Sequence, residues 1–160
     1  MNKRQKIVTA ILFGLFILAL AVSLIKITRV MQEKEAARVQ EAFGVMEKDS
    51  VDVVFIGSSH QFCSINPDLL YEDYGISSFM LATSAQTIPM SYYAAMETIE
   101  LQHPKMIVLE VLYCTNDFRT VTPEMSHTFF DGMPQCEARE LALEDLIEEG
   151  IIAVFDAVKS

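Results

Sequence analysis

A chain of 160 residues has room for one domain and a terminal extension. Its apolar share is 51%, and 22 acidic residues against 12 basic ones give a formal charge of −10. The basic residues gather at the N-terminus, so that residues 39–160 hold only five of them against twenty acidic residues. Such an acidic part lacks the basic footprint of a nucleic-acid-binding protein, and it is not expected to lie flat on anionic lipid.

The N-terminal segment predicts a membrane anchor. Three basic residues precede residues 7–25, which carry no charge. As a helix this block spans roughly 28 Å, close to the ~30 Å hydrocarbon core of a bilayer. We expect residues 1–27 to form a cytoplasmic tail and a single-pass, uncleaved anchor in the cell membrane, with the domain outside the cytoplasm. The alternative is a cleaved signal peptide, because Ala19-Leu20-Ala21 resembles a small-x-small cleavage site.

The next segment, residues 28–50, predicts a helical stalk. It is rich in Glu, Lys, Gln, Ala and Arg, and Val39, Phe43 and Met46 fall on one helical stripe. A solvated helix without a partner of its own is the simpler interpretation. A dimerising coiled coil is the alternative, but the segment holds too few heptads to support it.

Residues 51–160 alternate between apolar strand patterns and helical patterns. Asn66 and Pro67 predict a helix start, Gly75 predicts its end, and His103-Pro104 ends a later helix. The predicted order is strand 51–56, helix 67–74, strand 76–82, helix 89–102, strand 105–111 and, after an aperiodic segment, helix 137–149. Crossovers of this length imply right-handed βαβ units and a parallel sheet covered on both faces.

Two serines and a histidine follow the first strand at once, as Gly57-Ser58-Ser59-His60. Open α/β sheets bind their ligands at the carboxyl ends of the strands, which is where these side chains are expected. A plain strand-to-loop turn, whose hydroxyls bond the local backbone, is the structural alternative for these residues.

The segment Val53-Val-Phe-Ile-Gly-Ser-Ser-His60 resembles the first block of the SGNH (GDSL-like) hydrolase superfamily. It is closest to the Gly-Ser-Ser variants of membrane-tethered members, such as the DltD and alginate O-acetylation types. The resemblance implies a flavodoxin-like, three-layer α/β fold, of which residues 51–160 hold the N-terminal portion. It places the nucleophile at Ser59, and Ser58 stands where the GDSL pattern has Asp.

Two further segments resemble the other blocks of this superfamily more weakly. Residues 82–87 match the second block, whose amide at Ala85 would face the oxyanion. Residues 108–111, followed by Asn116-Asp117, resemble the third block. The resemblance thus implies an oxyanion hole built from Ser59, Ala85 and Asn116.

The histidine base of the family lies in an Asp-x-x-His segment after further strands, and this sequence has no such segment. His127, in Glu124-Met-Ser-His127, has the nearest spacing, and Ser58 and His60 are candidate accessory residues beside Ser59. Glu100 and His103 have the Glu-x-x-His spacing of carboxylate metal sites, but no matching carboxylate helices accompany them. We therefore expect neither a metal nor another cofactor.

Three cysteines, Cys63, Cys114 and Cys136, are widely and irregularly spaced. An odd number at such spacing is not a disulfide framework, and zinc sites usually have closely spaced ligand pairs. We expect ordinary core or loop residues, unless export of the domain allows one pair to form a bridge.

Two functions follow as hypotheses. The first is an anchored serine hydrolase or O-acyl-transfer domain, truncated here, that acts on an acylated glycan or lipid of the cell envelope. The second is a non-catalytic pseudo-enzyme that binds an envelope partner such as a membrane acyltransferase. Without the Asp-x-x-His segment, the sequence leaves open whether the chain is an enzyme.

Overall fold

The computed structural model describes residues 2–112, 121–122 and 129–148, with the side chains of residues 29–36 excepted. The chain divides into two compact units, Met1–Glu35 and Ala36–Ser160. The longest helix, α1 (Lys3–Gly44), begins in the first unit and ends in the second.

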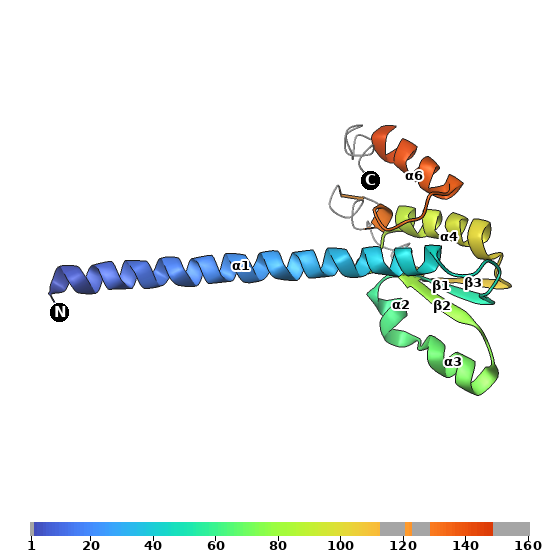
Figure 1. Ribbon diagram of the computed structural model, residues 1–160, viewed down its shortest axis with the longest axis horizontal. Helices are drawn as coiled ribbons and strands as arrows, with labels where there is room; N and C mark the ends of the chain where they lie inside the picture. Colours follow the sequence, from blue (N-terminus) through green and yellow to red (C-terminus); the bar gives the residue numbers. More distant parts are fainter. Residues whose placement is uncertain (1, 113–120, 123–128, 149–160) are drawn as a thin grey trace. The chain divides into compact units, whose positions relative to one another are not determined.

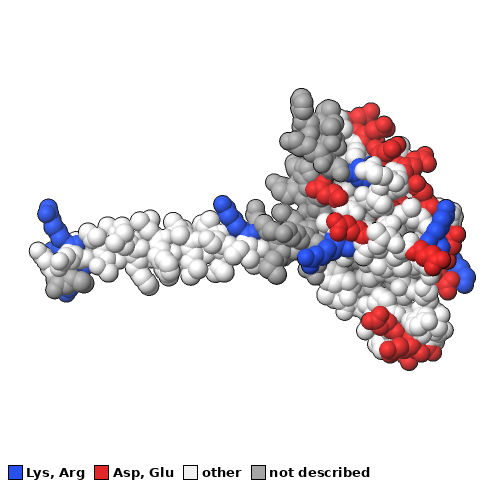
Figure 2. Space-filling view, in the orientation of Figure 1, with Lys and Arg blue, Asp and Glu red and all other residues white. Residues whose placement is uncertain are grey.

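In the first unit, α1 has a long uncharged stretch at residues 7–25. Its portion Lys3–Thr28 is long and apolar enough to cross a membrane, and none of its most apolar stretch is buried by other parts of the protein. A signal sequence near an N-terminus has the same length and composition. Figure 2 shows basic side chains near both ends of this stretch and uncharged ones between them. So much exposed apolar surface needs lipid or a partner to cover it.

The second unit contains a three-stranded parallel sheet in the order β2-β1-β3. The strands are β1 (Val53–Gly57), β2 (Ser78–Ala82) and β3 (Met106–Leu109). Helices α4 (Ile88–Gln102) and α6 (Glu137–Glu148) lie on one side of the sheet, and α2 (Ser59–Ser64) and α3 (Pro67–Tyr74) lie on the other (Figure 1). The predicted α/β class with a parallel sheet is therefore confirmed.

The central strand is β1, which is the most apolar of the three. Val54, Phe55 and Ile56 are at most 7% exposed, as expected for a strand with a neighbour on each side and helices on both faces. The third strand, which the sequence predicts at residues 105–111, is shorter than expected and more exposed than β1. Met106 is 58% and Leu109 is 44% exposed, because no strand of the described residues pairs with the outer edge of β3.

The core of the second unit lies on the α4 side of the sheet and includes the end of α1. Phe43 is fully buried there and packs against Phe79 of β2, with ring centroids 5.2 Å apart. Val39 and Met46 pack against the same core, so the predicted helical stripe is confirmed. The simpler interpretation, a solvated helix without a partner, was wrong for this end of α1. A Cβ on Gly132 would stand 2.3 Å from the Ala37 carbonyl oxygen, so only glycine permits this close approach to α1.

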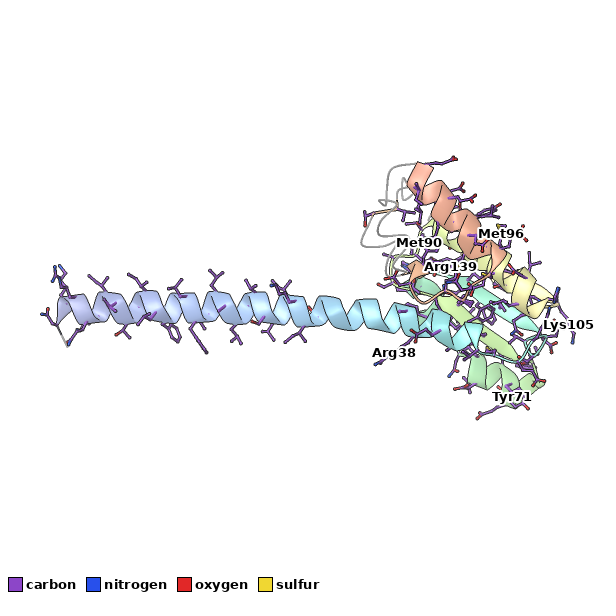
Figure 3. All side chains as sticks on the ribbon, turned by 45° about the horizontal axis from the view of Figure 1, so that its top comes forward. Arg38, Tyr71, Met90, Met96, Lys105 and Arg139 are labelled. Carbon is purple, nitrogen blue, oxygen red and sulfur yellow. The ribbon has the colours of Figure 1, made fainter. Side chains whose placement is uncertain are left out.

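The ends of α3 follow the predicted pattern, but the helix itself is largely exposed. The Asn66 side chain accepts a hydrogen bond from the amide of Asp68, and Gly75 ends the helix in the left-handed conformation. No residue of α3 is buried, and Leu69 and Tyr74 are 53% and 73% exposed. Tyr71 likewise projects from α3, on the side of the sheet away from Met90 and Met96 (Figure 3).

Candidate functional site

The three strands end together at one edge of the sheet, and their last residues are paired. Gly57 of β1 lies opposite Ala82 of β2, and Ile56 lies opposite Leu109 of β3. The pairing continues one step further, because the Thr83 amide donates to the Gly57 carbonyl and the Glu110 amide donates to the Ile56 carbonyl. The residues that follow the strands are therefore brought together at the carboxyl edge.

A carboxylate that the sequence analysis missed lies at the centre of this edge. Glu110, directly after β3, has only 10% of its side chain exposed. Its Oε2 accepts hydrogen bonds from the Ser58 amide, at 2.6 Å, and from the Ser58 hydroxyl, at 2.8 Å. Hydrogen bonds to a carboxylate are short and about twice as strong as neutral ones. The available signal was an acidic residue near the end of the apolar run at residues 105–111.

Gly57 makes room for this carboxylate. A Cβ at position 57 would stand 2.5 Å from Glu110 Cβ and 2.7 Å from its Oε2. Both distances are shorter than any van der Waals contact, so a larger residue would displace Glu110 from Ser58. Steric contact with Glu110 thus explains why the Gly-Ser-Ser segment has glycine at position 57.

His60 belongs to the same cluster. Its Nδ1 lies 3.2 Å from Ser58 Oγ and 3.6 Å from Glu110 Oε1, and its backbone amide donates to Ser58 Oγ at 3.4 Å. Ser58 is fully buried, whereas 63% of the His60 side chain is exposed. The two residues that the sequence marked as accessory are therefore in contact, and Glu110 holds both.

Ser59 is the first residue of α2 and is partly exposed. Its neighbour Ser58 is the N-cap of this helix, an arrangement that leaves the first helical amides without intrahelical acceptors. No described residue forms a hydrogen bond with the Ser59 hydroxyl. The sequence did not predict α2, which is only six residues long.

Ala85 lies in the turn that follows β2 and is exposed. Its φ of 56° is in the left-handed region, which favours glycine. The turn is held by the buried Gln86, whose Oε1 accepts from the Thr83 amide and hydroxyl, at 3.0 and 3.1 Å. Ala85 thus keeps a backbone N–H in a conformation that favours glycine.

The remaining predicted residues lie elsewhere. Asn116 and His127 are outside the described residues. His103 pairs with Asp49, with Nδ1 and Oδ1 2.8 Å apart. The Glu100 carboxylate accepts from the amides of Glu137 and Ala138, at the start of α6. Glu100 and His103 therefore have separate structural roles, and within the described part of the chain no three His, Cys, Asp or Glu side chains are grouped to hold a metal.

A second buried carboxyl, also missed from the sequence, lies in α4. Glu97 is fully buried, and neither carboxyl oxygen has a hydrogen-bond partner among the described residues. Burial, together with the charge of Glu100, raises the pKa of Glu97 from 4.5 to about 8. Burial also raises the pKa of the Cys136 thiol, which lies within electrostatic range of Glu97. This group is on α4, apart from the Ser58–Glu110 cluster.

Both described cysteines, Cys63 and Cys136, are free thiols; Cys63 is exposed and Cys136 is buried. Cys114 lies outside the described residues. When the chain is compared with known proteins, no protein-family model, no curated protein and no solved structure matches it.

Proposed function

We propose that this chain is a membrane-anchored serine hydrolase or O-acyl-transfer domain with Ser59 as its nucleophile. The observation that carries the proposal is the placement of Ser59, which is partly exposed on the first residue of a helix directly after the central strand. Parallel α/β sheets bind their ligands at this edge. Ser58 is fixed by Glu110, so the turn that presents Ser59 is held in one conformation.

The backbone supplies donors for an oxyanion. The amide of Ser59 is at the start of α2, and the amide of Ala85 is in the turn after the neighbouring strand. Asn116 is the third donor that the resemblance implies. One donor aimed at a developing oxyanion typically contributes about 3–4 kcal/mol to catalysis.

The apolar part of α1 suggests where the substrate is. As a single-pass anchor in the cell membrane, it would hold the domain at the outer surface, beside acylated glycans or lipids of the envelope. A hydrolase would release the acyl group of such an ester, and a transferase would pass it between an envelope glycan and a membrane acyltransferase partner. The acidic composition of residues 39–160 keeps the domain from lying on anionic lipid.

One observation favours the non-catalytic alternative, a tethered module that only binds an envelope partner. A nucleophilic serine needs a base within hydrogen-bond reach, and within the described ranges no side chain bonds the Ser59 hydroxyl. Under this alternative, the Ser58–Glu110 pair only stabilises the turn.

A fluorophosphonate probe distinguishes the two functions. The full chain in detergent should react with the probe, and Ser59→Ala should abolish the reaction. Ser64→Ala, at the exposed end of the same helix, is the matched control and should react as the wild type does. If the folded wild-type chain does not react, or if Ser59→Ala reacts equally well, the non-catalytic function is the better one.

A further inference from the structure

We propose that Glu110 and Ser58 hold His60 in its Nδ1–H tautomer, so that His60 Nε2 accepts the proton of Ser59 during acyl transfer. The catalytic part of this inference rests on the proposed function, whereas the tautomer does not. It assigns Glu110 and Ser58 as positioning residues and His60 as the base.

The tautomer follows from the hydrogen-bonding capacity of Ser58. Its hydroxyl has one proton, and a carboxylate can only accept, so the contacts of 2.8 and 3.0 Å to Glu110 use that proton. Ser58 Oγ must then accept at its other contacts, which are the His60 amide at 3.4 Å and His60 Nδ1 at 3.2 Å. Nδ1 therefore carries the ring proton, and Nε2 has a free lone pair.

Burial protects the hydrogen bonds between Ser58 and Glu110 from water. Ser58 is fully buried and the Glu110 side chain is only 10% exposed, so water does not compete for their bonds. The His60 side chain is 63% exposed, and its Nδ1 faces the buried pair. The free Nε2 is therefore on the side of the ring away from that pair, where a reacting group can reach it.

His60 and Ser59 are neighbours in α2, and adjacent side chains on a helix do not face each other. Proton transfer therefore passes through one water, which is a common route for a general base. The water gives a proton to His60 Nε2 and takes the proton of Ser59, while Oγ bonds to the acyl carbon. The bond from that carbon to the leaving alkoxide then breaks, and the alkoxide receives the proton that imidazolium held.

The tautomer is measured by the ring nitrogen shifts of 15N-histidine in the full chain in detergent, at a pH where histidine is neutral. In the wild type, we expect His60 to show a protonated Nδ1 and a bare Nε2. A protonated Nε2 would overturn the inference, whatever the enzyme does. Spectra of His60→Gln identify the signal.

Glu110→Gln is the sharpest variant, because it changes the bonding with almost no change in shape. The Gln oxygen would accept from the Ser58 amide, and its NH2 group, in the place of Oε1, would donate to Ser58 Oγ. With the His60 amide, this donor would occupy both lone pairs of Oγ, so His60 Nδ1 could no longer donate to it. The Ser58 proton would then point to His60 Nδ1, and the ring should change to the Nε2–H tautomer. Asp49→Asn is the matched control, since it alters the partner of His103 and should leave the His60 signals unchanged.

The rate of fluorophosphonate labelling tests the catalytic part. General bases typically contribute about 10²–10⁴-fold, so His60→Gln should slow labelling of Ser59 by ~100-fold or more, and Glu110→Gln by at least ~10-fold. Normal labelling of His60→Gln would overturn the role of His60 while leaving Ser59 as the nucleophile. If the wild-type chain is never labelled, the proposed function is wrong. The ring nitrogen shifts of His60 would still decide which tautomer is present.

Discussion

Glu110 Oε2 accepts hydrogen bonds from both the backbone amide and the hydroxyl of Ser58, at 2.6 and 2.8 Å. This contact joins the residue after β3 to the residue after β1, 52 positions apart in the sequence. It fixes the turn that presents Ser59, and it brings His60 next to a buried carboxylate. The structural role and the proposed chemical role of the site therefore depend on the same carboxylate.

Replacing Glu110 by Ala should destabilise the second unit. The variant leaves the Ser58 amide and hydroxyl buried without an acceptor, and a hydrogen bond to a charged group contributes about 1.5–3 kcal/mol. We expect the free energy of unfolding to fall by about 3 kcal/mol, measured by urea unfolding of the full chain in detergent. Glu72→Ala, on the exposed surface of α3, is the control and should have little effect. Equal stability of the two variants would show that the Ser58–Glu110 pair is not formed.

The sequence predicted this edge of the sheet but not its central contact. Val54, Phe55 and Ile56 are apolar enough to mark a buried strand wherever they fold, and Asn66 and Gly75 act through local backbone bonds. Such local rules predict elements and their ends. Glu110 is a lone acidic residue in the sequence, and its meaning depends on a partner that only the sheet brings near.

The same limit applies to the buried side of a helix. Tertiary packing decides which side of a helix is buried, and in α4 it buries Glu97 and Thr98 while Ile99 is 57% exposed. A buried carboxyl at this position contradicts the expectation from residue type. No pattern of apolar spacing would have identified Glu97.

Glu97 should make stability depend on pH. The pKa of Glu97 is about 8 in the folded protein and near 4.5 in the unfolded chain, so the folded state binds the carboxyl proton more tightly. The contribution of Glu97 to the free energy of unfolding should therefore fall as pH rises from about 4.5 to about 8, and then become constant. The total loss is on the order of 5 kcal/mol.

Glu97→Gln should remove this pH dependence and should be more stable than the wild type at pH values above the folded pKa. Urea unfolding of both proteins across the pH range measures the difference. Glu144→Gln, on the exposed side of α6, is the control and should follow the wild-type curve. A wild-type curve that matches Glu97→Gln throughout would mean that Glu97 ionises normally in the folded protein.

Ala85→Gly should stabilise the chain. A left-handed alanine costs about 1–2 kcal/mol, and glycine in the same place loses about 0.5–1 kcal/mol of backbone entropy on folding. Because Ala85 has a φ of 56°, we expect its replacement by glycine to raise Tm modestly. Ser84→Gly, one residue earlier in the same exposed turn, gains nothing of this kind and should lower Tm slightly. A lower Tm for Ala85→Gly would contradict the left-handed conformation.

The exposed thiol of Cys63 reports the side of the membrane on which the domain lies. In a Cys114→Ser background, Cys63 is exposed and Cys136 is buried, so a membrane-impermeant maleimide should react only at Cys63. We expect reaction in intact cells that express the full chain, as an extracytoplasmic domain requires. Additional replacement of Cys63 by Ser should abolish it. Reaction only after lysis would place the domain in the cytoplasm.

The most direct test of the account is to locate the fluorophosphonate adduct by mass spectrometry of peptides from the labelled, full-length protein in detergent. We predict one adduct, on the hydroxyl of Ser59, and none on Ser58, whose oxygen is buried against Glu110. An adduct on a different residue, or a folded chain without any adduct, would contradict the claim that this edge presents a nucleophile.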